Sequence, residues 1–396
     1  MRLSPFVLLL FLASSKHLGF ARHVRTHDSS FVPDYFLRVS YTQVAVACRD
    51  RFSAVVNGST PGPALRLQEN RTTWIRVHND FQNDNLTIHW HGLSQSVAPF
   101  SDGTPQVSQW PIPPSYFFDY EIRPQIGEAG TYFYHSHVDF QAVSAAGPLI
   151  VEEASGRPPY QHDGERIFFL SELFNKMDEE IMAGLTAPST EFIWSGETEQ
   201  LLVNGNGFPA HNNNNETQTA APFGIFPNGT TPSCHAEVTK VRPSTTYRFR
   251  AIGGVGLSLV SYMFEDHDNL TVIAADGSYT KPADADGRIQ TGSGQRLDYL
   301  FTTKSEAELK QLGKTNFWIQ METRYRPVNI TSYAILSYTD CAGCDTNTPN
   351  APPSTPPLTI TNEVQNWLEY TLESLTPNNF PPSSEVNRTS ASAALN

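Results

Sequence analysis

The chain has 396 residues, which is enough for two or three domains that each bury a hydrophobic core. Its net charge of −13 argues against nucleic acid or an anionic membrane as the main partner, because both require a basic surface. The low content of charged residues and the abundance of proline, phenylalanine and tyrosine are typical of a β-rich globular protein.

The N-terminus is predicted to be a signal peptide, residues 1–21. Arg2 precedes the apolar run Phe6–Ala13, which is too short to span a bilayer, and cleavage near Ala21 fits this pattern. The alternative is a buried first helix. Eight Asn-x-Ser/Thr glycosylation motifs support secretion to the extracellular space or the cell wall. These motifs begin at Asn57, Asn70, Asn85, Asn215, Asn228, Asn269, Asn329 and Asn387.

Residues 31–155 are predicted to form a first β domain, because short β-rich runs alternate with Gly/Pro turn signals. The predicted strands are Tyr35–Tyr41, Thr73–Val77, Leu86–Trp90, Phe117–Ile122 and Thr131–Tyr134.

Residues 160–344 are predicted to form a second β domain with two short helices, Asn175–Leu185 and Lys304–Leu312. Many short strands in both domains favour an all-β sandwich or barrel. The predicted strands are Ile167–Leu170, Gln200–Val203, Tyr247–Ile252, Leu270–Ala274, Leu297–Thr302, Phe317–Met321 and Ala334–Tyr338.

Residues 345–396 begin with a Pro/Thr-rich linker up to residue 360. An amphipathic helix is predicted over Glu363–Leu375, followed by a polar tail that reads as truncated.

Two His-x-His pairs are the main candidates for chemistry: His89 with His91, and His135 with His137. Residues i and i+2 of a strand point to the same face, so each pair directs two imidazoles to one side. If the two strands are neighbours, four imidazoles converge, and neutral imidazole is a good ligand for copper or zinc. A single such pair is more often a pair of structural histidines.

The segments around these pairs resemble the multicopper oxidase family, which includes laccases and ascorbate oxidases. His89-Trp-His-Gly and Tyr134-His-Ser-His-x3-Gln141 are similar to its first two copper motifs, and Val56-Asn-Gly-x-x-Pro-Gly-Pro63 and Asp102-Gly-Thr-x5-Trp110 to its other segments in this domain. Leu202-Val-Asn-Gly205 and Thr246-Tyr-Arg-Phe-Arg250 resemble the ascomycete ascorbate-oxidase-like branch.

The resemblance implies two consecutive cupredoxin-like Greek-key β-barrels and a trinuclear copper cluster that reduces oxygen to water. By motif match, His89 would bind the type 2 copper, His91 and His135 would share one type 3 copper, and His137 would bind the other. Asp102 would assist proton delivery, although an Asp-Gly turn residue explains it equally well. The reductant would be a phenol or an ascorbate-like molecule, and the activity could serve phenolic coupling in fungal pigment or secondary metabolism.

The resemblance also implies a disulfide between Cys48 and Cys234. Cys341 and Cys344 lack the second pair that a zinc site needs, so a local disulfide or two exposed thiols are expected.

The chain departs from the family at the type 1 copper site, which needs a thiolate and two histidines. The last histidine is His267, and Cys234-His235 lacks the required spacing. We therefore expect the third domain to be missing and a partner or a longer isoform to supply it. The competing hypothesis is a non-catalytic, secreted copper-binding glycoprotein or a decayed oxidase. An unrelated zinc hydrolase finds no support in the flanking motifs.

Overall fold

The computed structural model describes residues 27–28, 30–46, 49–174, 176, 178–188, 198–208, 211–212, 235–340, 347–361 and 368–376. The chain divides into two compact units, Met1–Val32 and Pro33–Asn396. In the shorter unit, the rings of His27 and Phe31 stack with their centroids 3.9 Å apart. The predicted signal peptide, residues 1–21, lies outside the described residues. Every element below belongs to the longer unit.

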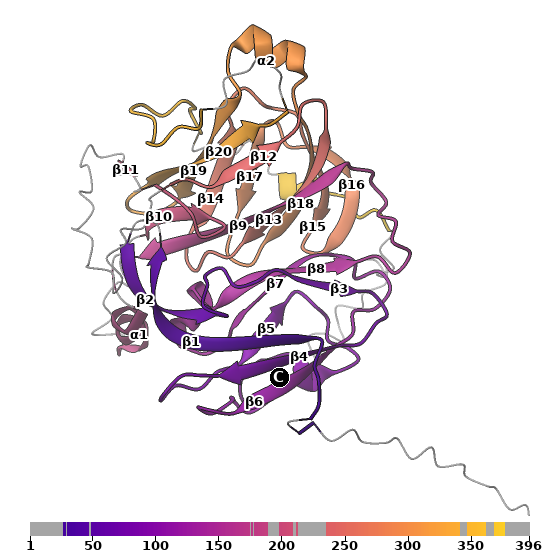
Figure 1. The fold of residues 1–396 in the computed structure, drawn as a ribbon, viewed down its shortest axis with the longest axis vertical. Helices are drawn as coiled ribbons and strands as arrows, with labels where there is room; N and C mark the ends of the chain where they lie inside the picture. Colours follow the sequence, from indigo (N-terminus) through magenta and orange to yellow (C-terminus); the bar gives the residue numbers. More distant parts are fainter. Residues whose placement is uncertain are drawn as a thin grey trace, which may run out of the picture. The chain divides into compact units, whose positions relative to one another are not determined.

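The first β domain consists of two four-stranded sheets, with strand orders β2-β1-β4-β6 and β3-β8-β7-β5. Alternate side chains of both sheets meet in one core, where Trp90, Tyr120 and Tyr134 are fully buried. Figure 1 shows these strands from indigo to magenta. Their bounds are β1 (Tyr35–Val46), β2 (Arg49–Val56), β3 (Leu65–Gln68), β4 (Thr73–Asn79), β5 (Ile88–His91), β6 (Phe117–Ile122), β7 (Gly130–Ser136) and β8 (Ala146–Glu152), with the 3-10 helices η1 (Pro99–Ser101) and η2 (Asp139–Val143) between them.

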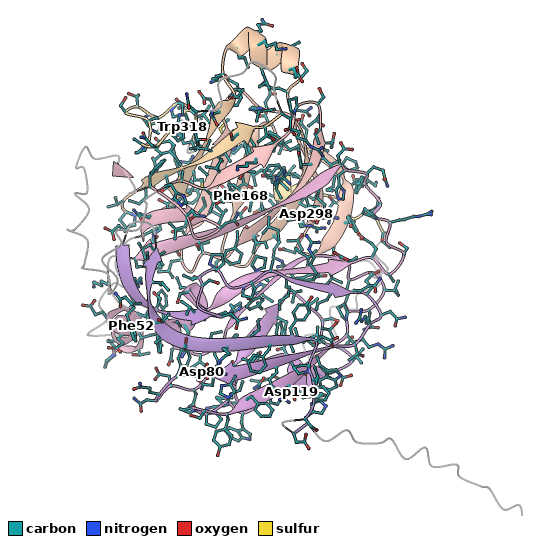
Figure 2. The ribbon with its side chains drawn as sticks, in the orientation of Figure 1. Phe52, Asp80, Asp119, Phe168, Asp298 and Trp318 are labelled. Atoms are coloured by element: carbon teal, nitrogen blue, oxygen red, sulfur yellow. The ribbon has the colours of Figure 1, made fainter. Side chains whose placement is uncertain are left out.

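The second β domain also consists of two sheets. One has the order β10-β9-β13-β18-β15-β16, and the other β11-β20-β19-β14-β17 with β12 paired to β20. Its aromatic core includes Phe168, which Figure 2 labels together with Asp298 on β18 and Trp318 on β19. The bounds are β9 (Gly164–Phe174), β10 (Thr198–Val203), β11 (His211–Asn212), β12 (Val238–Val241), β13 (Thr246–Gly253), β14 (Leu259–Phe264), β15 (Leu270–Ala275), β16 (Ser278–Asp284), β17 (Arg288–Thr291), β18 (Arg296–Thr302), β19 (Asn316–Arg324) and β20 (Ile330–Tyr338).

In the described part of the chain only two short α-helices accompany the many strands, and the predicted all-β fold with a few short helices is confirmed. α1 (Asp178–Thr186) lies where a short helix was predicted. α2 (Glu306–Leu312) begins with a capping box in which Ser305 and Glu308 bond to each other's backbone, and it ends at Gly313, whose φ is 67°. Among the described residues, no helix combines the length and the apolar character that a membrane crossing needs.

The predicted helix Glu363–Leu375 is wrong over its described part. Only η3 (Leu368–Tyr370) is helical there. The following residues pair with the edge of β16 instead: Lys281 N donates to Glu373 O at 2.8 Å, and Leu375 N donates to Tyr279 O at 2.9 Å. The backbone of this segment thus forms hydrogen bonds with the open edge of β16 instead of the internal hydrogen bonds of a helix. Residues 362–367 lie outside the described residues.

The described part of the predicted linker, residues 347–360, has no helix or strand. It is nevertheless anchored to β19. The Gln320 side chain accepts from Leu358 N at 2.9 Å and donates to Leu358 O at 2.8 Å. Arg324 also donates to the carbonyl of the buried Ile360 at 3.1 Å. This segment is therefore packed on the second β domain rather than acting as a free spacer.

Candidate metal centre

The pairing of β5 with β7 brings the predicted histidines together. His89 lies directly opposite His135, and His91 lies opposite Phe133. Residues opposite each other on antiparallel strands share a face, so these imidazoles point to the same side of the sheet. The ring centroid of His89 lies 5.4 Å from that of His135 and 5.7 Å from that of His91. The i, i+2 spacing and the strand register together produce this convergence.

Hydrogen bonds determine which ring nitrogen of His89 and His135 faces the cluster. His89 Nδ1 lies 2.7 Å from the carbonyl oxygen of Asp102, and His135 Nδ1 lies 2.7 Å from that of Ser136. A carbonyl only accepts, so each Nδ1 carries the proton. Each Nε2 then keeps a free lone pair for a metal ion, which is how such partners orient metal-binding histidines.

His91 faces the cluster through its other nitrogen. Its Nδ1 lies 3.3 Å from His135 Nε2, and one nitrogen each of His89, His91 and His135 lie within 4.8 Å of one another. Imidazole nitrogens bind such ions at about 2.0 Å, so two ligands of one ion lie about 3 Å apart. His91 Nδ1 and His135 Nε2 therefore fit one transition-metal ion, with a nitrogen of His89 close by. The His91 ring also stacks on Phe133, with centroids 4.5 Å apart.

His137 lines the same cavity but is exposed and lies outside the three-nitrogen cluster. Its ring centroid is 5.6 Å from that of His89 and 5.9 Å from that of His135. Its assignment to a separate metal ion stays a prediction.

The environment keeps two of the imidazoles neutral. Burial, followed by the nearby charges of His135 and Arg296, lowers the pKa of His91 to about 3. Burial also lowers the pKa of His135 to about 4, against the opposing effect of its bond to the Ser136 carbonyl. Because only the neutral ring binds a metal ion, these lowered pKa values favour coordination at neutral pH.

The histidines line a half-open cavity of about 360 Å³ with walls from both β domains. Phe140 and Val143 form an apolar wall from the first domain, while Gly254–Gly256 and Ser293–Gly294 close the other side from the second. We did not predict this second wall, because no local motif marks it. Its residues come together only through the packing of the two domains.

Asp102 contributes its backbone carbonyl to the site, as described above. Its Oδ2 accepts from Thr104 Oγ1 at 2.7 Å, and its Oδ1 lies 3.5 Å from His89 Nδ1. The carboxylate does not line the histidine cavity. Gly103 follows with φ +82°, as the turn interpretation expects. Proton delivery by Asp102 stays a prediction.

The remaining predicted sites are only partly described. All four cysteines, Cys48, Cys234, Cys341 and Cys344, lie outside the described residues, so the Cys48–Cys234 disulfide stays a prediction. Asn57, Asn70, Asn85 and Asn269 are exposed and Asn329 is half-buried. Asn215, Asn228 and Asn387 are not among the described residues.

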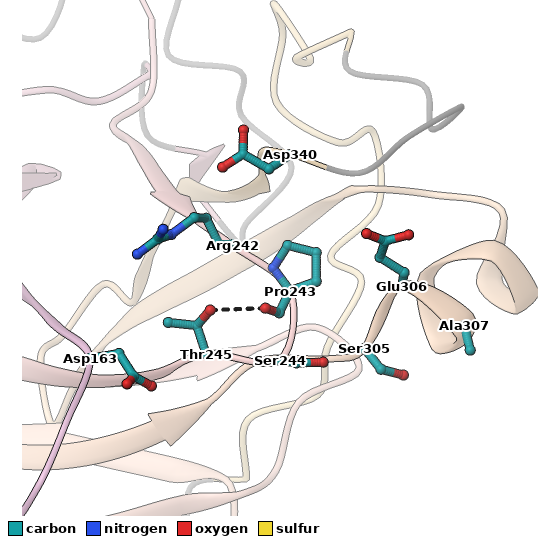
Figure 3. Close-up of a pocket in the computed structure, with 9 residues that line it drawn as sticks. All are labelled: Asp163, Arg242, Pro243, Ser244, Thr245, Ser305, Glu306, Ala307 and Asp340. Atoms are coloured by element: carbon teal, nitrogen blue, oxygen red, sulfur yellow. Dashed lines mark hydrogen bonds between the residues drawn. The ribbon is translucent and has the colours of Figure 1, made fainter.

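A second, larger cavity of about 830 Å³ lies in the second domain beside the start of α2. It carries the carboxylates of Asp163, Glu306 and Asp340 and the guanidinium of Arg242, without a histidine or cysteine. Figure 3 shows these carboxylates spread around the pocket, with one hydrogen bond among the drawn residues, from Thr245 Oγ1 to the Pro243 carbonyl. This arrangement offers no converging set of ligands.

Comparison with known proteins shows that both domains match models of the same protein family. Residues 38–156 and residues 164–340 each match a family model described as multicopper oxidase. The chain is 45% identical over 419 residues to the laccase-like multicopper oxidase 1 of Thermothelomyces thermophilus, covering 98% of this chain and 62% of that protein. It is 54% identical over 305 residues to the multicopper oxidase terE of Aspergillus terreus, covering 76% of this chain and 54% of that protein.

Among solved structures, the fold resembles that of Fet3p, described as a multicopper oxidase that functions in iron import. The TM-score is 0.64 at 21% identity, covering 86% of this chain and 57% of that chain. At this identity the likeness shows the fold alone. The chain thus spans little more than half the length of the relatives that it matches.

Proposed function

Because this chain belongs to the multicopper oxidase family and contains two cupredoxin-like domains of it, we propose that it is a copper-dependent oxidoreductase. The reaction would be the one-electron oxidation of a phenol or an ascorbate-like reductant, coupled to the reduction of oxygen to water. The observation that carries this proposal is the cluster of His89, His91 and His135, whose nitrogens lie within 4.8 Å of one another.

The four histidines would hold the copper ions: His89 the type 2 ion, His91 and His135 one type 3 ion, and His137 the other. The 3.3 Å separation of His91 Nδ1 and His135 Nε2 supports a shared ion for that pair. Bound copper supplies one-electron redox chemistry toward oxygen. The protein's own contribution is to orient the rings through the carbonyls of Asp102 and Ser136 and to surround them with apolar side chains.

The reductant side of the reaction needs residues beyond these 396. A type 1 site requires a thiolate beside histidines, and this sequence has no cysteine with that spacing. We propose that a partner or a longer form of the protein supplies it. The laccase-like description of one relative supports a phenolic reductant, and with it phenolic coupling in fungal pigment or secondary metabolism.

Copper uptake tests the proposed centre. The 396-residue chain is loaded with copper(II), dialysed and analysed for bound metal, alongside the double variant His89→Ala/His135→Ala. We expect the double variant to lose its copper. The control double variant His78→Ala/His235→Ala removes two histidines that do not line the cavity and should retain it. Equal uptake in all three proteins would reject the centre.

Optical spectroscopy tests the proposed division of the site. We expect the copper-loaded 396-residue chain alone to lack the blue absorption band of a thiolate–copper(II) site, and to oxidise phenols no faster than free copper. A blue preparation of this chain alone would contradict our assignment of the type 1 site to residues outside it.

The alternative function is a non-catalytic copper-binding glycoprotein, which the three-histidine cluster also supports. Oxygen consumption separates the two. If the longer protein or complex binds copper but reduces no oxygen with phenolic or ascorbate-like reductants, the binding function stands and the oxidase does not. We further propose secretion, which the exposed motif residues Asn57, Asn70, Asn85 and Asn269 support. Mass spectrometry of the native protein for N-glycans and for a start near residue 22 tests it.

A further inference from the structure

The His91 ring is held between the two β domains. Phe133 of the first domain stacks on it, with the ring centroids 4.5 Å apart. The turn Gly292–Gln295 of the second domain also approaches the His91 ring. Gly294 lies in that turn with φ +78°. A Cβ atom at Gly294 would lie 2.7 Å from His91 Cε1 and 2.8 Å from Nε2, closer than real Cβ contacts. The second domain therefore touches the imidazole with bare backbone.

Arg296, immediately after this turn, holds Gly294 in place. Its Nη1 donates to the Gly294 carbonyl at 2.8 Å and lies 3.1 Å from the carboxylate of Asp276. Its Nε donates to the carbonyl of Thr131 on β7 at 3.2 Å. Only 5% of Arg296 is exposed. The planar guanidinium of Arg296 thus connects the turn that contacts His91 with β7, the strand that carries His135.

Gly92, the last residue of the His-Trp-His-Gly motif, makes room for this arginine. Gly92 has φ +93°, and a Cβ atom there would lie 2.2 Å from Arg296 Nη2. The guanidinium also lies 5.6 Å from the ring centroid of Tyr132. The positive φ of Gly92 and the approach of an arginine from the other domain both favour glycine at this position of the motif.

We propose that Gly294 and Arg296 are positioning residues of the second domain, which set the His91 ring so that its Nδ1 faces His135 Nε2. This inference rests on the proposed copper centre. A purely structural role of the same contacts would lower the stability of the protein without changing the copper environment, so the two readings predict different results.

The first test is Gly294→Ala, compared with Gly313→Ala. Both glycines have positive φ, 78° and 67°, but a Cβ atom at Gly313 meets nothing within 4 Å. The full chain of each variant is titrated with copper(II), and the affinity and the electron paramagnetic resonance spectrum are recorded. We expect Gly294→Ala to weaken copper binding by about 10- to 100-fold and to change the spectrum, while Gly313→Ala keeps both.

The second test is the pair Arg296→Met and Arg296→Lys, with Arg324→Met as the control. Arg324 is equally buried in the second domain, but it bonds to Glu322 and to the Ile360 carbonyl rather than to the Gly294 carbonyl. We expect Arg296→Met to weaken copper binding and change the spectrum, and Arg296→Lys to restore part of both. Thermal denaturation of the metal-free proteins verifies that each variant folds.

The outcomes separate the two proposals. If the unaltered chain binds no copper, the proposed function fails. If it binds copper and both Gly294→Ala and Arg296→Met give the affinity and spectrum of the unaltered chain, the positioning role is rejected while the centre stands. If the variants lose stability to the same extent as their controls and keep the copper affinity and spectrum of the unaltered chain, the positioning role is likewise rejected.

Discussion

The chemistry of the site depends on single backbone carbonyls. Asp102 and Ser136 each accept the Nδ1 proton of a histidine, and this leaves Nε2 of both rings directed at the cavity. Among the residues that the structure describes, His91 bonds to no carbonyl and instead directs Nδ1 toward His135. Asp102 was predicted for its carboxylate, and the structure adds a contact of its backbone carbonyl with His89.

Gly103→Ala tests how tightly this carbonyl is placed. A Cβ atom at Gly103 would lie 1.8 Å from the Ile88 carbonyl, next to His89. We expect the variant to lose about 2–4 kcal/mol of unfolding free energy in a denaturant titration, from backbone strain and overpacking, and to bind copper less tightly. Gly127→Ala is the control, since Gly127 has φ +96° with open space around it and should lose only about 1 kcal/mol. Equal losses in the two variants would contradict this placement.

His267 predicts a pH dependence that is independent of copper. Its Nδ1 donates to the Glu265 carbonyl at 2.6 Å, and its Nε2 accepts from Tyr338 Oη at 2.7 Å. Burial, only partly opposed by the Glu265 carbonyl, lowers the pKa of His267 to about 4. Since the unfolded chain takes up this proton near pH 6.5, the unfolded state binds more protons between about pH 6.5 and about pH 4.

Stability therefore falls as the pH drops through that window, and His267 accounts for about 3 kcal/mol of the loss. We expect His267→Gln, which can still accept from Tyr338, to show a flatter dependence of unfolding free energy on pH than the unaltered chain. Denaturant titrations of the metal-free proteins at several pH values between 4 and 7 measure this. Parallel curves for the two proteins would show that His267 is not the group responsible.

Local sequence patterns predicted the strands better than they predicted the structure of the C-terminal segment. The β-rich run Phe117–Ile122 coincides with β6, and His89 and His91 lie on β5, whereas His137 follows the end of β7. The segment before Leu375 has an amphipathic pattern that also suits a helix, but the open edge of β16 decides its structure. Such an edge is created by residues a hundred positions away in the sequence, so a local pattern cannot reveal it.

Hydrogen exchange tests this edge pairing. We expect the amides of Lys281 and Leu375 to exchange slowly, because each donates to the opposite segment. Leu375→Pro removes one donor and should speed exchange at Lys281. Glu373→Ala removes only the exposed ion pair with Lys281 and should leave both amides protected. Fast exchange at Lys281 in the Glu373→Ala protein would mean that the ion pair, and not the backbone, holds this segment.

At the scale of the whole chain, the sequence predicted the histidine side of the cavity. The His-x-His motifs are local signals, so neighbouring residues reveal them. The wall from Gly254–Gly256 and Ser293–Gly294 could not be predicted in this way, because it depends on how two domains with separate cores meet. The interface between the two domains also contains a buried network of polar side chains. The contribution of this network to the association of the domains can be tested.

Arg250 of β13 lies at the centre of that network. It donates to Thr131 Oγ1 of the first domain at 2.9 Å and also pairs with Glu165 and Asp298. Only 4% of Arg250 is exposed, so its removal takes a buried cation from Glu165 and from Asp298, which keeps its ion pair with Arg248. We expect Arg250→Met to lower the unfolding free energy by about 3–5 kcal/mol. We also expect calorimetry to show two separate thermal transitions where the unaltered chain shows one, because the domains lose a shared anchor.

Thr131→Val separates the link between domains from the charge effect. Valine keeps the shape of threonine but removes the acceptor for Arg250, while Glu165 and Asp298 stay paired. If the shared anchor couples the domains, this small change should also broaden or split the transition, with a loss of only about 1–3 kcal/mol. If Thr131→Val leaves a single sharp transition and Arg250→Met splits it, the coupling arises from charge balance within the second domain. The cavity wall around His91 would then depend on Gly294 and Arg296 rather than on Arg250.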